Sequence, residues 1–365
     1  MPPTKSIDRE SFSAIVPPEK IPFGDSLPCK ILSLDGGGIK GIFTACYLAE
    51  LERLADGGPI SNYFHMIAGT STGGIIALGL GKGLSAAEIA SLYLDHGAEI
   101  FSQDRWNADN LLWLGELVKS HPDGWLKNKA MFLHDVKYSK YSDIPLMRLM
   151  DNIVGDTKFG ESCVALCVPS VDGNRHQPVI FKTPHHPDFE LDWEKTMLEV
   201  GMGTAAAPTY FKPSEDENYI LLDGALIGNN PLMIAIVDIL SRTNVPADQI
   251  RSLSINCGGE LPEMTEKQIG GAGLYEWRFA VDHFNYYQSK NAVGQAKLMT
   301  GPQNVHRVEP RKENRNIEMD DFENASKRLP EDARHKAQED FKVLQSVLFK
   351  EPVTPLPFFH GPKKA

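Results

Sequence analysis

One serine in the chain stands where a nucleophile could be built. Ser71 is the centre of Gly-Thr-Ser-Thr-Gly at residues 69–73, between an apolar stretch at 65–68 and a small-residue apolar stretch at 74–80. In a strand-to-helix turn, G-x-S-x-G lifts the serine side chain above the sheet, and its two glycines avoid a backbone clash. The dipole of the following helix favours a developing negative charge. The pattern predicts Ser71 as a nucleophile, with a plain Gly/Ser/Thr connection as the alternative.

A second glycine turn, Asp-Gly-Gly-Gly-Ile-Lys-Gly at residues 35–41, precedes the serine. The backbone N–H groups of Gly36, Gly37 and Gly38 could hold the oxyanion of a tetrahedral intermediate, at about 3–4 kcal/mol for each donor. The same glycines fit G-x-G-x-x-G, which cradles a pyrophosphate in dinucleotide-binding folds. An acid should then end the second strand, but Asp56 lies in a turn before that strand begins. The pairing with a serine turn one strand–helix unit later favours the oxyanion hole.

A serine nucleophile needs a proton acceptor within reach. Asp223 ends the apolar stretch at 219–222 and is followed by Gly224, which leaves room around it. Strand ends carry the active site in parallel α/β sheets, so Asp223 can return beside Ser71 on another strand. A turn-forming Asp-Gly is the common alternative. His65 is expected in the core or a turn, and a triad would have to draw on a late histidine: His283, His306, His335 or His360.

The elements that position these residues follow a repeated pattern. Strand, glycine turn and helix occur twice in succession, at 30–54 and 65–80, which predicts a parallel sheet covered on both faces. Ser85 and Glu88 have capping-box spacing at the start of a helix that should reach Phe101. Further helices are expected from residue 143 and at 193–202, 231–240 and 275–299, with two charged helical segments after 310. Further strands are expected at 164–168, 178–181, 219–224, 251–256 and 304–308.

Residues 102–142 show no clear period and predict an irregular insertion near the site. Their tryptophans could line an acyl groove or enter lipid, or simply pack as a lid: Trp106, Trp113 and Trp125.

Bulk composition excludes several classes of protein. The net charge of −11 does not fit a nucleic-acid binder and argues against charge-driven binding to anionic membranes. No apolar run of about 18 residues predicts a transmembrane helix, and no signal peptide is seen, so a cytoplasmic protein is expected. Five scattered cysteines indicate free thiols. Cys163 and Cys167 lie in an expected buried strand, and neither a metal site nor a cofactor is expected.

Four motifs appear in the order shown by patatin-like phospholipases. They are the turns at 35–41 and 69–73, Ala-Ala-Pro-Thr-Tyr-Phe at 206–211 and Asp-Gly-Ala at 223–225. The chain resembles this family over residues 30 to 310. The resemblance implies a three-layer α/β/α sandwich with a mostly parallel central sheet. It also implies metal-independent release of fatty acid from glycerolipids by a Ser–Asp dyad without histidine.

Carried onto this sequence, the resemblance implies that Ser71 attacks the ester carbonyl and Asp223 takes its proton. The amides of Gly37 and Gly38, together with Gly36, would hold the oxyanion. Lys40 stands where plant members usually have arginine, and it keeps the charge but lacks the planar fork. The alternatives are a nucleotide-binding oxidoreductase that uses the first glycine turn and a catalytically idle storage or interaction protein of patatin shape.

The expected organisation is an extended arm at 1–28, a catalytic domain at 29–310 and a helical extension at 311–365 packed on that domain. As a whole the chain resembles the bacterial phospholipase effectors of anti-phage signalling. That resemblance implies a phospholipid substrate at the inner face of the membrane and activation by a cyclic dinucleotide. A homodimer is a further hypothesis.

Basic residues after 306 are candidates for binding the two phosphates of such a ligand, because Arg and Lys make strong charge-assisted bonds. The alternative is a solvated surface interleaved with acids such as Glu309, Glu313 and Asp332. The candidates form two groups: Arg307, Arg311, Lys312 and Arg315 near a strand end, and Lys327, Arg328, Arg334 and Lys336 on helices.

Overall fold

The computed structural model describes residues 19–24, 27–56, 58–101, 139–215, 219–259 and 280–364. Trp106, Trp113 and Trp125 lie outside the described residues, as do residues 1–18 and 25–26 of the arm expected at 1–28. The expectations for these two segments therefore stay predictions.

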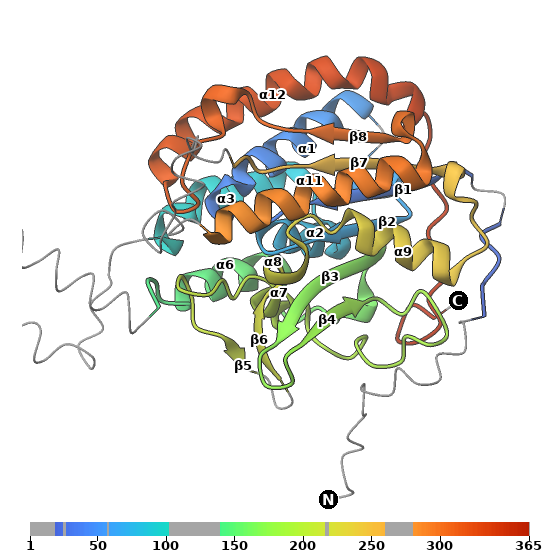
Figure 1. The fold of residues 1–365 in the computed structure, drawn as a ribbon, viewed down its shortest axis with the longest axis horizontal. Coiled ribbons are helices and arrows are strands. Elements are labelled where there is room, and N and C mark those ends of the chain that lie inside the picture. The colour runs from blue at the N-terminus through green and yellow to red at the C-terminus, as the bar shows by residue number, and fades with distance from the viewer. Residues whose placement is uncertain are drawn as a thin grey trace, which may run out of the picture.

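A mixed sheet of eight strands forms the middle layer of the molecule (Figure 1). Its order is β5-β6-β3-β2-β1-β7-β8, and β4 pairs with β3 outside this path. The run β3-β2-β1-β7-β8 is parallel, whereas the pairings made by β4, β5 and β6 are antiparallel. The strands are β1 Cys29–Leu34, β2 Met66–Gly69, β3 Ala165–Asp172, β4 Gln177–Lys182, β5 Ser214–Glu215, β6 Ile220–Asp223, β7 Ile250–Ile255 and β8 Val305–Val308.

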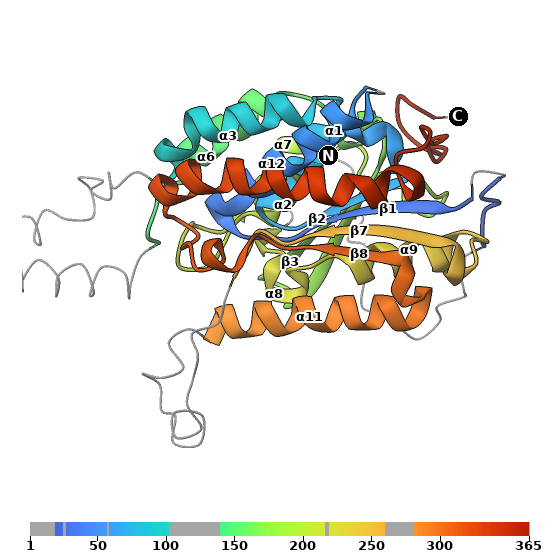
Figure 2. The ribbon, with the colours of Figure 1, turned by 90° about the horizontal axis from the view of Figure 1, so that it is seen from above.

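Helices cover both faces of the sheet, so the predicted three-layer α/β/α sandwich is confirmed (Figure 2). One layer holds α1 Gly41–Ala55, α2 Thr72–Lys82, α3 Ala86–Ile100, α6 Ile144–Val154, α7 Met197–Thr204 and α12 Phe322–Val347. The other holds α8 Ala225–Gly228, α9 Leu232–Arg242 and α11 Ala280–Thr300. Within the part of the chain that the structure describes, no helix is long and apolar enough to cross a membrane.

Strand β1 shows why this sequence builds a sheet covered on two sides. All six of its residues are buried. Successive side chains of a strand point to opposite faces. Leu32 and Leu34 accordingly enter the core under α1 and α2, while Cys29 and Ile31 enter the core under α9. Apolar residues on both faces of one strand are what a parallel sheet with helices on both sides requires.

Strand β3 brings two strands together end to end. Residues 165–167 pair with β2, residues 170–172 pair with β6, and residues 167–172 pair with β4. A strand has only two edges, and β4 shares paired residues with both of the others. Strands β2 and β6 must therefore occupy the same edge of β3, one beyond the other. Because β6 is antiparallel to β3 and β2 is parallel, their carboxyl ends face each other.

Three local predictions meet different outcomes in the structure. The capping box at Ser85 and Glu88 is confirmed, and α3 begins at the next residue. The helix expected from residue 193 begins only at Met197, because Thr196 and Glu199 form a capping box of their own. The two charged segments expected after 310 are mainly one helix of 26 residues, α12, which continues through Pro330.

Helix α12 packs along α1 through a stripe of small and apolar residues, Ala325, Leu329, Ala333 and Ala337, which join the core beneath it. Residues four apart lie on one helix face, so this spacing lets the two helices approach closely. The division of the chain at 28 and 310 stays a prediction.

Candidate active site

Ser71 occupies a strained turn between β2 and α2. Its φ of 54° and ψ of −125° are rare for a residue with a side chain. The flanking glycines are sterically required, since a Cβ on Gly69 would lie 2.2 Å from the Gly73 carbonyl oxygen. A Cβ on Gly73 would lie 2.3 Å from the carbonyl oxygen of Leu34. The turn has the geometry of a nucleophile elbow, with its serine at the N-terminus of a helix.

Asp223 reaches this turn from the opposite direction. It is the last residue of β6, whose carboxyl end faces that of β2, so it lies beside the residues that follow Gly69. Gly224 permits the chain to turn away here, because a Cβ at that position would lie 2.2 Å from the Pro169 carbonyl oxygen. The sequence argument assumed a parallel strand for Asp223. The structure corrects this: the strand is antiparallel and meets the parallel strands head-on.

The environment of Asp223 suits a proton acceptor. The residue is 3% exposed, and burial raises the pKa of its carboxyl to about 6. Two hydrogen bonds lower this pKa, but by less than burial raises it. They come from the Ala225 amide, at 2.7 Å from Oδ1, and from the Ser71 hydroxyl. Desolvation favours the neutral acid, so the carboxylate binds a proton more tightly than an exposed aspartate does.

The first glycine turn supplies backbone donors next to Ser71. A Cβ on Gly36 would lie 3.1 Å from the Ser71 Cβ. The Gly36 amide donates to the Asn229 carbonyl at 3.1 Å, so it is not available for an oxyanion. This bond corrects the expectation for Gly36. The amides of Gly37 and Gly38 have no hydrogen-bond acceptor among the described residues, and both glycines are partly exposed.

A buried ion pair anchors the base of this glycine turn. Arg307 on β8 donates two hydrogen bonds to the Asp35 carboxylate, at 2.8 and 2.6 Å, and further bonds to Ser289 and Ser254. Asp35 is fully buried, so the guanidinium satisfies a charge that would otherwise be costly. The pairing corrects the proposal that Arg307 binds a ligand phosphate. Sequence reasoning missed it because Asp35 and Arg307 are distant in the chain and share no motif.

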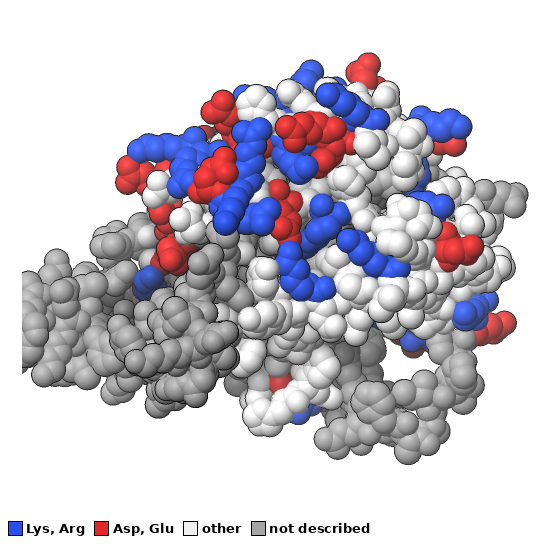
Figure 3. All heavy atoms as spheres, turned by 45° about the horizontal axis from the view of Figure 1, so that its top comes forward, with Lys and Arg blue, Asp and Glu red and all other residues white. Residues whose placement is uncertain are grey.

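The remaining basic candidates lie mostly in contact with acids. Figure 3 shows Lys and Arg side chains interleaved with Asp and Glu over the upper part of this face. The pairs are Arg311 with Asp332, Arg315 with Glu309, Lys327 with Glu323, and Lys336 with Asp340. The pattern matches the interleaved charged surface that was the alternative to a phosphate site.

The dinucleotide-binding alternative does not fit the structure. Asp56 ends helix α1 in a left-handed conformation, whereas a ribose-binding acid should end the second strand. Lys40 is buried and directs its ammonium group to the Gly258 carbonyl, at 3.4 Å. The charged group of Lys40, in the first glycine turn, thus contacts a protein carbonyl.

The histidines pair away from Ser71 and Asp223. His65 is 1% exposed and accepts a hydrogen bond from the Lys30 amide, as expected for a core or turn residue. Its pKa is lowered to about 4 by burial and by the charge of Lys30. The late candidates contact other partners: His283 packs against Tyr287, His306 lies beside Asp340, His335 lies beside Glu331, and His360 bonds to the Pro187 carbonyl. In the described chain, none of them bonds to either dyad residue.

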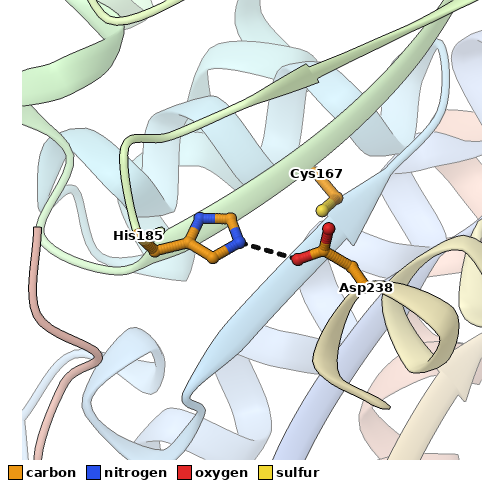
Figure 4. Close-up of side chains that lie close together, drawn as sticks. All are labelled: Cys167, His185 and Asp238. Atoms are coloured by element: carbon orange, nitrogen blue, oxygen red, sulfur yellow. Dashed lines mark hydrogen bonds and ion pairs between the residues drawn. The ribbon is translucent and has the colours of Figure 1, made fainter. Parts of the chain in front are cut away.

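A second polar cluster, which sequence reasoning did not find, lies between β3, β4 and α9. Cys167, His185 and Asp238 place their ligand-type atoms within 4.8 Å of one another (Figure 4). His185 bonds directly to Asp238 at 2.8 Å and through its other ring nitrogen to Thr183. Lys182 also pairs with Asp238. Burial raises the pKa of the Cys167 thiol, whereas a metal-binding thiol must be deprotonated. In this structure the cluster is held by the ion pair between Lys182 and Asp238 and by the hydrogen bond between His185 and Asp238.

The comparison with protein families agrees with this geometry. Residues 32–236 match the family described as patatin-like phospholipase. Because this match covers more than half of the 365 residues, the chain belongs to the patatin-like phospholipase family. Among solved structures, that of VipD from Legionella pneumophila matches with a TM-score of 0.40 at 12% identity, over 86% of this chain and 66% of that chain.

Individual relatives are similar over part of their length. A cGAMP-activated phospholipase of Escherichia coli strain TW11681 is 35% identical over 63% of this chain and 62% of that protein. A cGAMP-activated phospholipase of Pseudomonas aeruginosa strain BWHPSA011 / Pa011 is 34% identical over 57% of this chain and 56% of that protein. Patatin-like protein 2 of Arabidopsis thaliana is 31% identical over 68% of this chain and 64% of that protein. The chain thus matches less than two thirds of each of these relatives.

Proposed function

We propose that this protein is a serine lipid acyl-hydrolase of the phospholipase A type, which cleaves fatty acyl esters of membrane glycerophospholipids. One observation carries the proposal: a serine in a strained turn lies beside a buried aspartate whose pKa is raised to about 6. A base with a pKa near the working pH accepts a proton and returns it efficiently. The family and the names of the bacterial relatives support a phospholipid ester as the substrate.

In the proposed reaction, the Ser71 oxygen attacks the ester carbonyl carbon while Asp223 takes the hydroxyl proton. The carbonyl oxygen becomes an oxyanion, which the amides of Gly37 and Gly38 stabilise. When this intermediate collapses, the lysophospholipid leaves with the proton from Asp223, and the fatty acyl group stays on Ser71. Water then attacks the acyl ester, gives a proton to Asp223 and releases the fatty acid, and the proton returns to Ser71.

Activation by a cyclic dinucleotide is the second part of the proposal. It is supported by the relatives from E. coli, P. aeruginosa and Vibrio cholerae that are named cGAMP-activated phospholipase. The enzyme would be a cytoplasmic homodimer that acts on the inner face of the membrane in anti-phage signalling. The ligand must bind the active state more tightly than the idle one. A shift from about 1% to 99% active requires about 5.5 kcal/mol of differential affinity.

The first test labels the purified protein with a serine-reactive fluorophosphonate. We expect labelling of the unchanged protein and of Ser326→Ala, a surface control whose hydroxyl donates to the Glu323 carbonyl. Ser71→Ala should not be labelled. Equal labelling of Ser71→Ala would overturn Ser71 as the nucleophile, and an unlabelled native protein would favour the idle storage protein.

The second test measures fatty acid release from phospholipid vesicles with a panel of cyclic di- and trinucleotides. We expect at least one cyclic dinucleotide to raise the rate strongly, and the Ser71→Ala variant to stay inactive with all of them. Full activity without any nucleotide, unchanged on adding them at micromolar levels, would overturn the activation proposal and leave the hydrolase proposal standing.

A further inference from the structure

The last residue of α7, Thr204, and the turn that follows it contact both halves of the proposed dyad. The Ser71 amide donates to the Thr204 hydroxyl oxygen at 3.1 Å. The Gly224 amide, next to Asp223, donates to the Thr204 carbonyl at 3.2 Å. The Asp223 amide donates to the Ala206 carbonyl at 3.0 Å. Thr204 itself is fully buried, so these contacts lie in a site closed to bulk water.

The direction of the hydrogen bonds at Thr204 is determined by chemistry. Its hydroxyl donates to the Pro169 carbonyl at 2.6 Å. A carbonyl can only accept and an amide can only donate, so the single hydroxyl proton points to Pro169 and a lone pair faces Ser71. The three groups form a one-way chain from the Ser71 N–H through the Thr204 O–H to the Pro169 carbonyl.

Pro169 lies at the junction between the two strands that bring the dyad together. It falls in β3 between residues 165–167, which pair with β2, and residues 170–172, which pair with β6. Proline has no N–H group, so only its carbonyl needs a partner there. Thr204 supplies that partner and ties the junction to Ser71. An amide as buried as that of Ser71 would otherwise be left without an acceptor in a strained turn.

We propose that Thr204 is the positioning residue of the site: its hydroxyl fixes the Ser71 turn relative to Asp223. This inference rests on the proposed function. The third motif of the sequence begins two residues after Thr204, and its Ala206 carbonyl accepts the hydrogen bond of the Asp223 amide. Because the Thr204 hydroxyl accepts the hydrogen bond of the Ser71 amide, that amide is not available to an oxyanion. Thr204 acts through the dyad and touches no substrate.

The test compares Thr204→Val, which keeps the shape and loses the hydroxyl, with Thr204→Ser, which keeps the hydroxyl. Misplacement of a reacting group by about 1 Å can cost roughly a hundredfold in rate. We expect Thr204→Val to lower kcat and the rate of fluorophosphonate labelling by roughly 10- to 100-fold, with KM within about twofold. Thr204→Ser should restore most of both rates, and the pH of half-maximal rate should stay near that of the native protein.

A matched control is Thr243→Val at the end of α9. Thr243 is 2% exposed, and its hydroxyl likewise donates to a carbonyl, that of Ile239, and accepts from an amide, that of Val245. This variant should lower thermal stability about as much as Thr204→Val while keeping native labelling and turnover. Equal losses of rate in both variants would overturn the proposal, because they would show a general effect of losing a buried hydroxyl.

The labelling rate separates this proposal from the proposed function, because it needs no lipid and can be compared between variants with and without a cyclic dinucleotide. Native labelling and turnover in Thr204→Val would overturn the role of Thr204 alone. Labelling that persists in Ser71→Ala would instead count against the proposed function. If Thr204→Val does not fold, Thr204→Ser decides: native rates support the proposal, and a rate as low as about 1% of native in this folded variant overturns it.

Discussion

Asp223 and Asp238 are almost equally buried, at 3% and 1% exposed, yet their pKa values move in opposite directions. Burial raises the pKa of Asp223 to about 6, and among the described residues no cationic side chain pairs with it. Desolvation acts on Asp238 as well, but the hydrogen bonds and charges of His185 and Lys182 outweigh it and lower its pKa. Burial alone therefore does not decide what a carboxylate can do.

The difference between the two regions lies in what surrounds each carboxylate. Asp238 sits between a lysine and a histidine that β4 and the turn after it bring to α9. Asp223 accepts hydrogen bonds from a serine hydroxyl and one backbone amide, that of Ala225, which stabilise its charge less. A charged pair anchors structure, whereas a lone carboxylate with a raised pKa is a candidate for proton transfer.

The largest expected effect is on turnover in the Asp223→Asn variant. An amide cannot accept the serine proton, so kcat should fall by at least about 10³-fold, as it should in Ser71→Ala. Asp151→Asn, on the exposed side of α6, serves as the control and should keep native turnover. Hydrolysis of phospholipid under activating conditions is the measurement. Near-native turnover in Asp223→Asn, with loss in His283→Ala or His306→Ala, would indicate a triad instead.

The next effect is on stability in the Asp238→Asn variant. Removing one partner of a buried ion pair leaves the charge of the other without compensation. The free energy of unfolding should therefore fall by about 3–5 kcal/mol in urea titrations at pH 7. The control is Asp188→Asn, since Asp188 is 53% exposed and pairs with Arg242 at the surface. That loss should stay below about 1 kcal/mol. Equal small losses in both variants would show that the cluster is not an anchor.

A third prediction concerns opposite pH dependences of stability. The raised pKa of Asp223 means that its contribution to stability is present below about pH 4 and lost as pH rises through about 6. Asp223→Asn should therefore be more stable than the native protein at pH 8, by up to about 3 kcal/mol for a shift of about two pKa units. The lowered pKa of Asp238 means that its contribution is present above about pH 4 and lost at lower pH.

Urea unfolding at a series of pH values from 3 to 8 measures both trends. The same base should make kcat/KM of the native enzyme rise as pH increases through about 6, because only the carboxylate accepts a proton. A flat kcat/KM between pH 5 and 8, together with unchanged stability of Asp223→Asn, would show that Asp223 is an ordinary acid.

The smallest expected effect is that of a chelator. If Cys167, His185 and Asp238 form an ion-pair network, EDTA should leave both the hydrolysis rate and the melting temperature unchanged. A metal that binds the folded state would stabilise it by mass action and raise the melting temperature. Added zinc should therefore leave the melting temperature unchanged if the cluster binds no metal. Loss of hydrolysis in EDTA that calcium restores would instead indicate a calcium-dependent phospholipase.

Several features could be predicted from sequence because their causes are local. Gly69 is required by the backbone of its own turn, where a Cβ would meet the Gly73 carbonyl, and the capping box at Ser85 spans only four residues. The burial of β1 on both sides follows from its four apolar residues, two on each face. Such signals depend on neighbours in the chain, so the α/β/α class and the candidate nucleophile can be read without knowledge of tertiary contacts.

The tertiary structure alone decided how distant segments meet. Asp223 ends an antiparallel strand that faces β2, because β3 is long enough to pair with both along one edge. Arg307 turned out to hold Asp35 and not a ligand, and Thr204 to join Ser71 to the Pro169 carbonyl. These partners share no spacing rule, since a buried charge or amide is satisfied by whichever group the packed fold brings within reach.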